Sequence, residues 1–304
     1  MIRKFFQKKK KKNGADTFLY TVNELNNIKY SSERLASINA KKICKDFLKY
    51  KKSNTLFVLG SGPTINDLDK ADFELIAKHD SIGFNWWLVH DFVPTMYMFQ
   101  FPPNRENEIT SIFKDRENEY KEVPIIFRGS QLGVNSDEYL PIIESTFGGY
   151  DIYFMNEFPV HSKCEIDVDK LIQFVKNLGF FEYSRIPKFF VKWRGTLGLL
   201  VSFGYAMGYE RIVLCGIDMN DETAGQHFFD ATDYNESRSK YSLPASGEHN
   251  IHTMMDTQYS KNTVGVYLAA LNQHMRTRNE SQIYVASSKS ALASILPLWP
   301  FKQQ

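Results

Sequence analysis

The segment Asn54–Asp69, NTLFVLGSGPTINDLD, constrains the fold of this chain more than any other. Its first part, Thr55 to Leu59, is a run of strand-forming residues, and the glycine turn Gly60-Ser61-Gly62-Pro63-Thr64 follows at once. A helix start is expected after this turn. A buried strand that passes through such a turn into a helix is typical of α/β proteins with a parallel sheet, in which ligands bind at the carboxyl ends of the strands.

Apolar runs alternate with helical or polar connections along the rest of the chain. Strands are expected at residues 80–85, 95–100, 123–129, 150–156, 212–215 and 281–287, and helices at 18–52, 195–209 and 262–276. We therefore predict a Rossmann-like, mostly parallel sheet flanked by helices, formed as a single domain over residues 18–304. Residues 219–258 are polar, lack periodicity and are predicted to form a lid.

Composition excludes some classes of function. The net charge of +2 gives no case for nucleic-acid binding. The 3 cysteines, Cys44, Cys164 and Cys215, lack the spacing of a metal site, which favours a reducing compartment. No apolar run reaches the roughly 20 residues that span a bilayer, and no signal peptide is recognisable, so a cytoplasmic protein is expected.

The first 17 residues are strongly basic and are predicted to be a disordered tail. An alternative stays open, in which Lys8 to Lys12 attract the chain to an anionic membrane. Each basic residue near such a surface contributes about 1 kcal/mol. Peripheral attachment at the inner face of the cell membrane is therefore the second expectation for location.

The glycine turn is suited to a phosphate, because glycines allow close approach and a helix N-terminus offers free N–H donors. It is not a GxGxxG motif, since Ile65 occupies the position of the third glycine, and no Walker lysine follows. Thr64 is predicted to cap the helix, with Asp67 three residues further on. A tight turn with a purely structural role remains the alternative.

Polar residues also follow other predicted strands. Asn85, Gln100 and Asp218 stand at predicted carboxyl ends and are expected to line one pocket. Three basic side chains, of Arg128, Lys192 and Arg194, are candidates to bind a carboxylate or phosphate. Arg194, just before the predicted helix start at Gly195, is the best placed of these, and surface solvation is the default expectation for the other two.

Three histidines lie within the predicted lid, namely His227, His249 and His252. An imidazole suits a general base at neutral pH, and His252 is our prediction for that role, with Asp256 orienting it and Tyr259 beside it. A hydrated loop without a catalytic role is the alternative. These residues could also form part of a metal site, but no HExxH or DxD motif is present, so a metal-independent reaction is expected.

Taken in order, these residues resemble the single-domain bacterial sialyltransferases of glycosyltransferase family 42. That family has a G-N-G-P-S turn, an asparagine after the second strand and another after the third, a Ser/Thr-Gly helix opening, and G-I-D after the following strand. The equivalents here are Gly60-Ser61-Gly62-Pro63-Thr64, Asn85, Gln100, Arg194-Gly195-Thr196 and Gly216-Ile217-Asp218. The later segments YSKNTVGVYLAAL (259–271) and KSALASIL (289–296) are similar to the family's H-S-K-N-T and N-S-L-L-A pieces. The resemblance covers residues 54–296.

The resemblance implies a GT-A-like nucleotide-binding domain with a lid. Its reaction would be metal-independent transfer of sialic acid or a related nonulosonic acid from a CMP-activated donor to a surface glycan, such as lipopolysaccharide or capsule. By carry-over, the turn and Asn85 would hold cytidine monophosphate, and Thr196 would contact its phosphate or ribose. Asp218 and Asn220 would face the sugar nucleotide. His227 or a neighbour in the segment GQHFFD stands where the family has a phosphate-contacting tyrosine, and Ser260 and Lys261 belong to the segment matched to H-S-K-N-T.

The chain departs from the family at several of these positions. Ser61, Gln100 and Asn220 replace the family's residues, and the general-base histidine aligns with Tyr259. Three alternatives therefore stay open: a retaining Kdo-type transferase with Asp218 as nucleophile, a Mg²⁺-dependent phosphotransferase or pyrophosphokinase, and a non-catalytic nucleotide-binding protein. The nonulosonic acid, the acceptor, the linkage and a homo-oligomeric state are also left open.

Overall fold

The computed structural model describes residues 23, 25–101, 105–129, 136–160, 168–180, 182–220, 223, 226–244 and 263–301. Its centre is an 8-stranded sheet with the strand order β1-β6-β5-β4-β3-β2-β9-β10, and all neighbouring strands are parallel. The strands are β1 (Lys41–Lys42), β2 (Thr55–Leu59), β3 (Asp80–Phe84), β4 (Met96–Phe99), β5 (Ile125–Arg128), β6 (Ile152–Met155), β9 (Arg211–Cys215) and β10 (Gln282–Val285). The predicted α/β fold with a mostly parallel sheet is confirmed.

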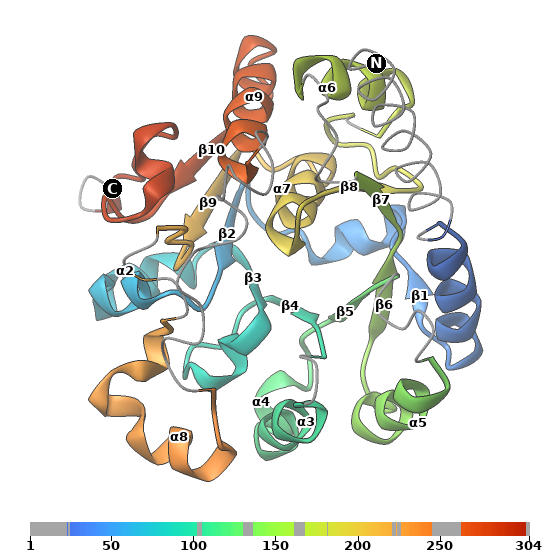
Figure 1. Ribbon diagram of the computed structural model, residues 1–304, viewed down its shortest axis with the longest axis vertical. Coiled ribbons are helices and arrows are strands. Elements are labelled where there is room, and N and C mark those ends of the chain that lie inside the picture. The colour runs from blue at the N-terminus through green and yellow to red at the C-terminus, as the bar shows by residue number, and fades with distance from the viewer. Residues whose placement is uncertain are drawn as a thin grey trace, which may run out of the picture.

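Helices cover both faces of this sheet (Figure 1). The α-helices after the first are α2 (Lys70–Ile76), α3 (Glu106–Asp115), α4 (Glu117–Tyr120), α5 (Ser136–Phe147), α6 (Val168–Asn177), α7 (Thr196–Ala206), α8 (Asn235–Tyr241) and α9 (Val264–Thr277). Short 3₁₀ helices are η1 (Lys45–Tyr50), η2 (Pro63–Asp67), η3 (Asn85–Val89), η5 (Phe228–Asp230), η6 (Thr232–Tyr234) and η7 (Ala291–Ser294). The helix α7 is buried at every position, as its uniformly apolar sequence predicts.

Alternate residues of β2 belong to different cores. Leu56 and Val58 pack in a cluster with residues of α7 and α9, whereas Phe57 and Leu59 pack in a second cluster with residues of α3 and α5. Strands buried on both faces read as continuous apolar runs, which is why β2 could be recognised from the sequence. The result is a three-layer arrangement of helices, sheet and helices (Figure 1).

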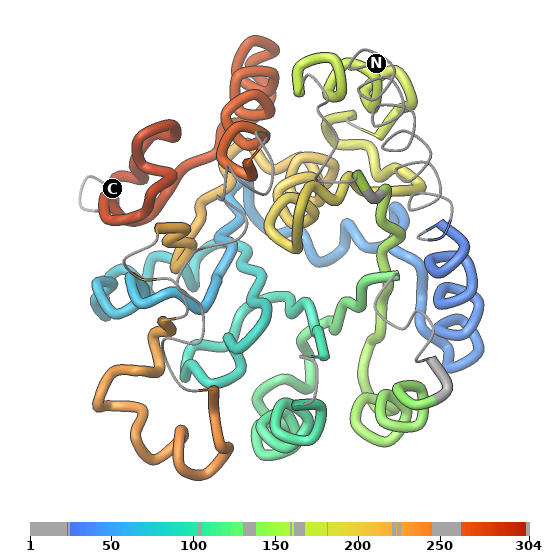
Figure 2. The backbone as a smooth tube through the Cα atoms, in the orientation of Figure 1, coloured from blue at the N-terminus to red at the C-terminus, as the bar shows by residue number. Residues whose placement is uncertain are grey.

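The order of the strands creates a switch point beside β2. The chain runs from β2 through β3, β4 and β5 to β6 in one direction, and it later returns to the other side of β2 to form β9 and β10. Figure 2 shows this return, with the late segment of β9 and β10 lying next to the early segment of β2. In open α/β sheets, ligands bind in the crevice outside the carboxyl ends of strands at such a point.

The prediction for the first helix was wrong, and one pair of strands was missed. The predicted helix at 18–52 is a helix over residues 25–37, followed by β1 and η1. Asn39 ends this first helix, since its φ of 61° places it in the left-handed region that stops helices. A separate parallel pair, β7 (Glu157–Val160) and β8 (Phe190–Trp193), was not predicted. Part of the predicted lid is regular, since η5, η6 and α8 lie within it, and residues 245–258 are outside the described residues.

The helix expected directly after the glycine turn begins later than predicted. Residues 63–67 form the 3₁₀ helix η2, whose N-cap is Gly62, so Thr64 lies inside this helix and does not cap it. The first α-helix after the turn, α2, is capped by Asp69. The Asp69 side chain accepts from the Asp72 amide, and Asp72 accepts from the Asp69 amide in return.

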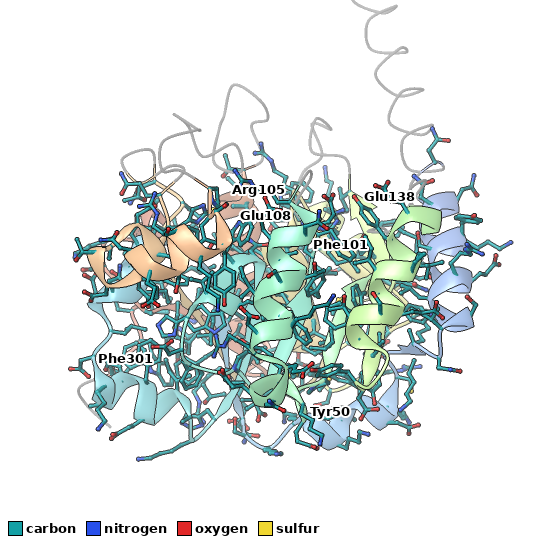
Figure 3. The ribbon with its side chains drawn as sticks, turned by 90° about the horizontal axis from the view of Figure 1, so that it is seen from below. Tyr50, Phe101, Arg105, Glu108, Glu138 and Phe301 are labelled. Atoms are coloured by element: carbon teal, nitrogen blue, oxygen red, sulfur yellow. The ribbon has the colours of Figure 1, made fainter. Side chains whose placement is uncertain are left out.

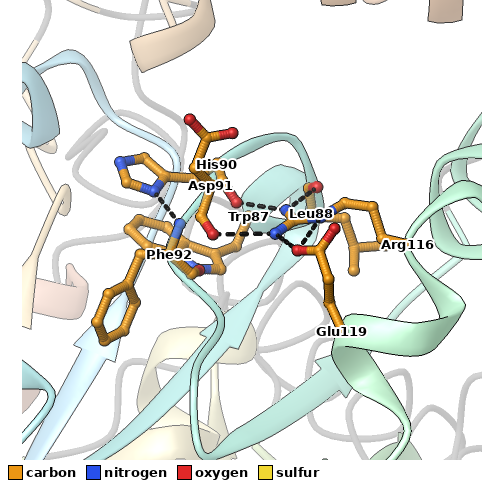
Figure 4. Close-up of polar contacts among 7 residues, drawn as sticks. All are labelled: Trp87, Leu88, His90, Asp91, Phe92, Arg116 and Glu119. Atoms are coloured by element: carbon orange, nitrogen blue, oxygen red, sulfur yellow. Dashed lines mark hydrogen bonds and ion pairs between the residues drawn. The ribbon is translucent and has the colours of Figure 1, made fainter.

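A partly buried arginine stabilises the connection between β3 and β4. Arg116 donates through its guanidinium to the carbonyl oxygens of Leu88, His90 and Asp91, and it also pairs with Glu119 (Figure 4). These carbonyls lie at the end of η3, where helical hydrogen bonds run out. The arginine therefore satisfies acceptors that the 3₁₀ helix leaves open.

The basic tail at residues 1–17 is outside the described residues. Among the residues that the structure describes, no helix combines the length and the apolar character needed to cross a membrane.

Candidate functional site

The glycine turn continues the pairing of β2 with β9 beyond the ends of both strands. The Gly60 amide donates to the Cys215 carbonyl at 2.8 Å, and the Gly62 amide donates to the Gly216 carbonyl at 2.9 Å. A Cβ atom at Gly60 would lie 2.6 Å from the Gly216 carbonyl oxygen, and one at Gly62 would lie 2.5 Å from Asp218 Oδ2. Close packing of two backbone segments therefore accounts for both glycines, in addition to any role towards a ligand.

This packing leads to a first test. The substitution Gly62→Ala is expected to lower the free energy of unfolding by about 2 kcal/mol, because the methyl group must displace a backbone carbonyl or the Asp218 carboxylate. Chemical denaturation measures the change. Gly149→Ala is the control, since a Cβ atom there meets nothing within 4 Å. Equal stability of the two variants would contradict the packing argument.

Asp218 joins the end of β9 to the glycine turn. The residue is 6% exposed, and its carboxylate accepts hydrogen bonds from the Thr64 amide at Oδ2, at 3.1 Å, and from the Thr64 hydroxyl at Oδ1. Burial raises the pKa of the Asp218 carboxyl above its ordinary value, and the two hydrogen bonds from Thr64 oppose that rise. The structure thus brings together two predicted site residues, but both oxygens of the carboxylate are engaged by the turn.

Ser61 and His227 also meet at this point. His227 Nδ1 lies 3.3 Å from Ser61 Oγ, and the following amide, of Phe228, donates to the Ser61 carbonyl at 2.9 Å. The His227 ring stacks on Phe229 with a centroid distance of 4.6 Å. Residues 227–229 therefore lie against the glycine turn, and together with Ser61, Thr64 and Asp218 they define what we call the turn site.

A second polar cluster lies at the ends of β4 and β5. The Thr196 hydroxyl donates to Gln100 Oε1 at 3.1 Å, and Arg128 Nη1 donates to Gln100 Oε1 at 3.3 Å and to Thr196 Oγ1 at 3.2 Å. Arg128 Nε donates to Glu157 Oε1 at 2.6 Å, and Lys192 Nζ lies 3.7 Å from Glu157 Oε2. We call these five residues the Gln100 cluster.

The surface solvation considered for Arg128 and Lys192 is wrong. Their side chains are 13% and 17% exposed, and the Glu157 carboxylate between them is fully buried. Glu157 was not predicted as a site residue. It is the first residue of the short strand β7, and no apolar periodicity in the sequence indicates that strand. A charged residue beside the apolar run at 152–155 was the one available signal.

Three further predicted site residues, Asn85, Arg194 and Asn220, follow three different strands, namely β3, β8 and β9. Asn85, directly after β3, has a φ of 54°, and its carbonyl accepts from the Tyr97 hydroxyl. Arg194, with a φ of 55°, precedes Gly195, the N-cap of α7. Asn220 shapes the loop after β9, since it donates to the Lys289 carbonyl and accepts from the Thr223 amide.

The predicted general base lies outside the described residues. This applies to His252 and Tyr259, to Ser260 and Lys261, and to His249 and Asp256. Their roles stay predictions. Among the described residues, no three His, Cys, Asp or Glu side chains converge as a metal site would require.

The opposite edge of the sheet carries an open depression of about 400 Å³, lined by Leu48, Lys51, Lys52, Ser53, Asn54, Ser184 and Met207. Figure 3 shows the two edges, with Phe101 and Arg105, which follow β4, at one edge and Tyr50, which precedes β2, at the other. The depression lies at the amino ends of the strands and is therefore separate from the turn site and the Gln100 cluster.

Two comparisons with known proteins identify no relative of this chain. No protein-family model matches the sequence, and a search of curated proteins gives no significant match. Any statement about function therefore depends on the arrangement of the chain's own residues.

Proposed function

We propose that this chain is a glycosyltransferase that moves sialic acid or a related nonulosonic acid from a CMP-activated donor to a surface glycan. The observation that carries the proposal is the position of the turn site at the switch point between β2 and β9. A mononucleotide phosphate suits this place, because the Ser61 hydroxyl and the His227 ring lie together at the edge where α/β sheets bind ligands.

The polar residues of the turn site have separate roles in this proposal. Ser61 and His227 donate hydrogen bonds to the phosphate that leaves with cytidine, which lowers the energy of the developing charge. Asp218 holds Thr64 and with it the shape of the turn. The acceptor hydroxyl is activated by a base from the segment after residue 244, with His252 or Tyr259 as the predicted group.

The engagement of Asp218 favours this positioning role over the retaining alternative. A nucleophilic carboxylate needs one oxygen that can approach the anomeric carbon. Here the two oxygens accept from the amide and the hydroxyl of Thr64. Attachment to an anionic membrane through Lys8 to Lys12 remains a prediction, which a lipid-linked acceptor would make useful.

A thermal-shift screen tests the proposed function. The purified chain is heated with CMP, CDP, UDP, GDP, ATP or NAD, each with and without EDTA. A ligand at 100 times its Kd stabilises the folded state by about 2.7 kcal/mol, so we expect a clear rise of Tm with cytidine nucleotides in both conditions. Ser61→Ala should reduce this rise, and Ser145→Ala, on the exposed face of α5, should leave it unchanged. No response to cytidine nucleotides, or a response to ATP that EDTA abolishes, would contradict the proposal.

A further inference from the structure

The hydrogen bonds of the Gln100 cluster decide which way the Gln100 amide faces. Arg128 Nη1 and the Thr196 hydroxyl both lie within 3.3 Å of the same amide atom. A guanidinium has donors only, so the atom facing it must be the oxygen Oε1. The amide nitrogen of Gln100 therefore points to the other side, as a pair of N–H donors.

Arg128 is itself held in place. Its Nε donates at 2.6 Å to Glu157, whose carboxylate is fully buried, and the Arg128 side chain is 13% exposed. A guanidinium fixed by one edge cannot rotate away from the Gln100 oxygen without breaking a buried ion pair, which is costly. Glu157 of β7 thus holds Arg128, and Arg128 in turn fixes the orientation of the Gln100 amide at the end of β4.

The donor side of Gln100 is open. Gln100 is partly exposed, and among the described residues no group accepts a hydrogen bond from its amide nitrogen. Strands lie about 4.8 Å apart, and β4 is two strands from β2, so Gln100 stands about 10 Å from the glycine turn along the same edge. One nucleotide sugar reaches across such a distance.

The surroundings of this donor favour a negatively charged oxygen. Thr196 is the first residue of α7, an 11-residue helix whose N-terminal end carries a partial positive charge. The guanidinium of Arg128 lies behind the amide oxygen and polarises the amide in the same direction. Hydrogen bonds to ionised oxygens are the stronger ones, so such a donor gains most from a carboxylate or phosphate.

We infer that the Gln100 amide nitrogen, oriented by Arg128 and Glu157, binds an anionic oxygen of the ligand at the carboxyl end of β4. The inference rests on the proposed function, and it adds that this part of the site recognises either the carboxylate of the transferred acidic sugar or the phosphate of the donor. Gln100 is a specificity-determining residue, and Arg128 and Glu157 are positioning residues.

The test is the nearly isosteric substitution Gln100→Glu. One carboxylate oxygen keeps the contacts with Arg128 and Thr196, while the other replaces the N–H donors by negative charge. Binding of CMP, CMP-activated sialic acid, free sialic acid and inorganic phosphate is measured by calorimetry for the wild type, for Gln100→Glu and for the control Gln173→Glu on the exposed face of α6. A thermal melt of each variant verifies that it is folded.

We expect Gln100→Glu to bind one of the charged ligands about tenfold more weakly than the wild type, or more weakly still. The control Gln173→Glu should bind every ligand with the affinity of the wild type. If only ligands with a sugar carboxylate are weakened, the carboxylate is the group recognised. If CMP and inorganic phosphate are weakened, it is the phosphate.

Unchanged affinity of Gln100→Glu for every ligand that the wild type binds would overturn the inference while leaving the proposed function standing. If the wild type binds phosphate or free sialic acid but not CMP, the proposed function fails. The inference about Gln100 is then tested by comparing the affinities of the wild type and Gln100→Glu for the ligand that binds. A wild type that binds none of the four overturns both.

Discussion

Glu157→Gln is expected to lower the free energy of unfolding by about 3–5 kcal/mol, which is the usual cost of removing one partner from a buried ion pair. The Glu157 carboxylate is fully buried, with Arg128 Nε at 2.6 Å and Lys192 Nζ at 3.7 Å. A neutral amide would still accept one hydrogen bond, but it would leave two positive side chains facing each other without their shared counter-charge. Urea denaturation at neutral pH measures the loss.

Glu182→Gln is the matched control for this measurement. The Arg185–Glu182 pair has the same N–O distance of 2.6 Å, but its side chains are 73% and 36% exposed. Exposed pairs contribute about 0.2–1 kcal/mol, so this variant should remain close to the wild type. If both variants lost the same stability, burial would not be what makes the Glu157 pair important.

A second large effect is expected from pH. The ring of His90 is buried against Trp87 at a centroid distance of 4.5 Å, and its Nδ1 accepts from the Phe92 amide at 3.0 Å (Figure 4). Burial, opposed by Asp91 and helped by nearby Arg116, lowers the pKa of His90 to about 4. The folded state therefore holds the neutral imidazole.

The sign of the pH effect follows from proton binding. In the unfolded chain the pKa of a histidine is about 6.5, so between pH 6.5 and 4 the unfolded state binds more protons than the folded state. Stability is full above pH 6.5 and falls as the pH drops, with a loss of about 3 kcal/mol from His90 by pH 4. Burial also lowers the pKa of His79 and of His274, which adds to the slope in the same direction.

The variant His90→Phe isolates the contribution of His90. It keeps an aromatic ring in the pocket but cannot take up a proton, and it leaves the Phe92 amide without its acceptor. We expect it to be less stable than the wild type at pH 7 and to lose less on acidification. Parallel stability curves for the two proteins between pH 7 and 4 would show that His90 does not titrate as a buried neutral group.

The α/β architecture could be predicted from the sequence, because it depends on the pattern of apolar residues within each strand and helix. The apolar runs of β2, β4, β5 and β9 are buried, and such runs identify strands whatever lies beside them. The placing of Asp218 and Gln100 at carboxyl ends followed directly from the strand ends. The uniformly apolar helix α7 was likewise readable, since its residues have no solvent-facing side.

The connections between distant segments were decided by the tertiary structure alone. Thr64 was predicted to cap a helix, yet its hydroxyl binds Asp218, which lies 154 positions away in the chain. Arg128 was expected at the surface, yet it is buried against Glu157 on an unpredicted strand. Local sequence specifies which residues end a strand, because backbone propensity and apolar periodicity are properties of neighbours. The partner of a polar side chain depends on which strand ends meet across the sheet, and only the folded topology determines that.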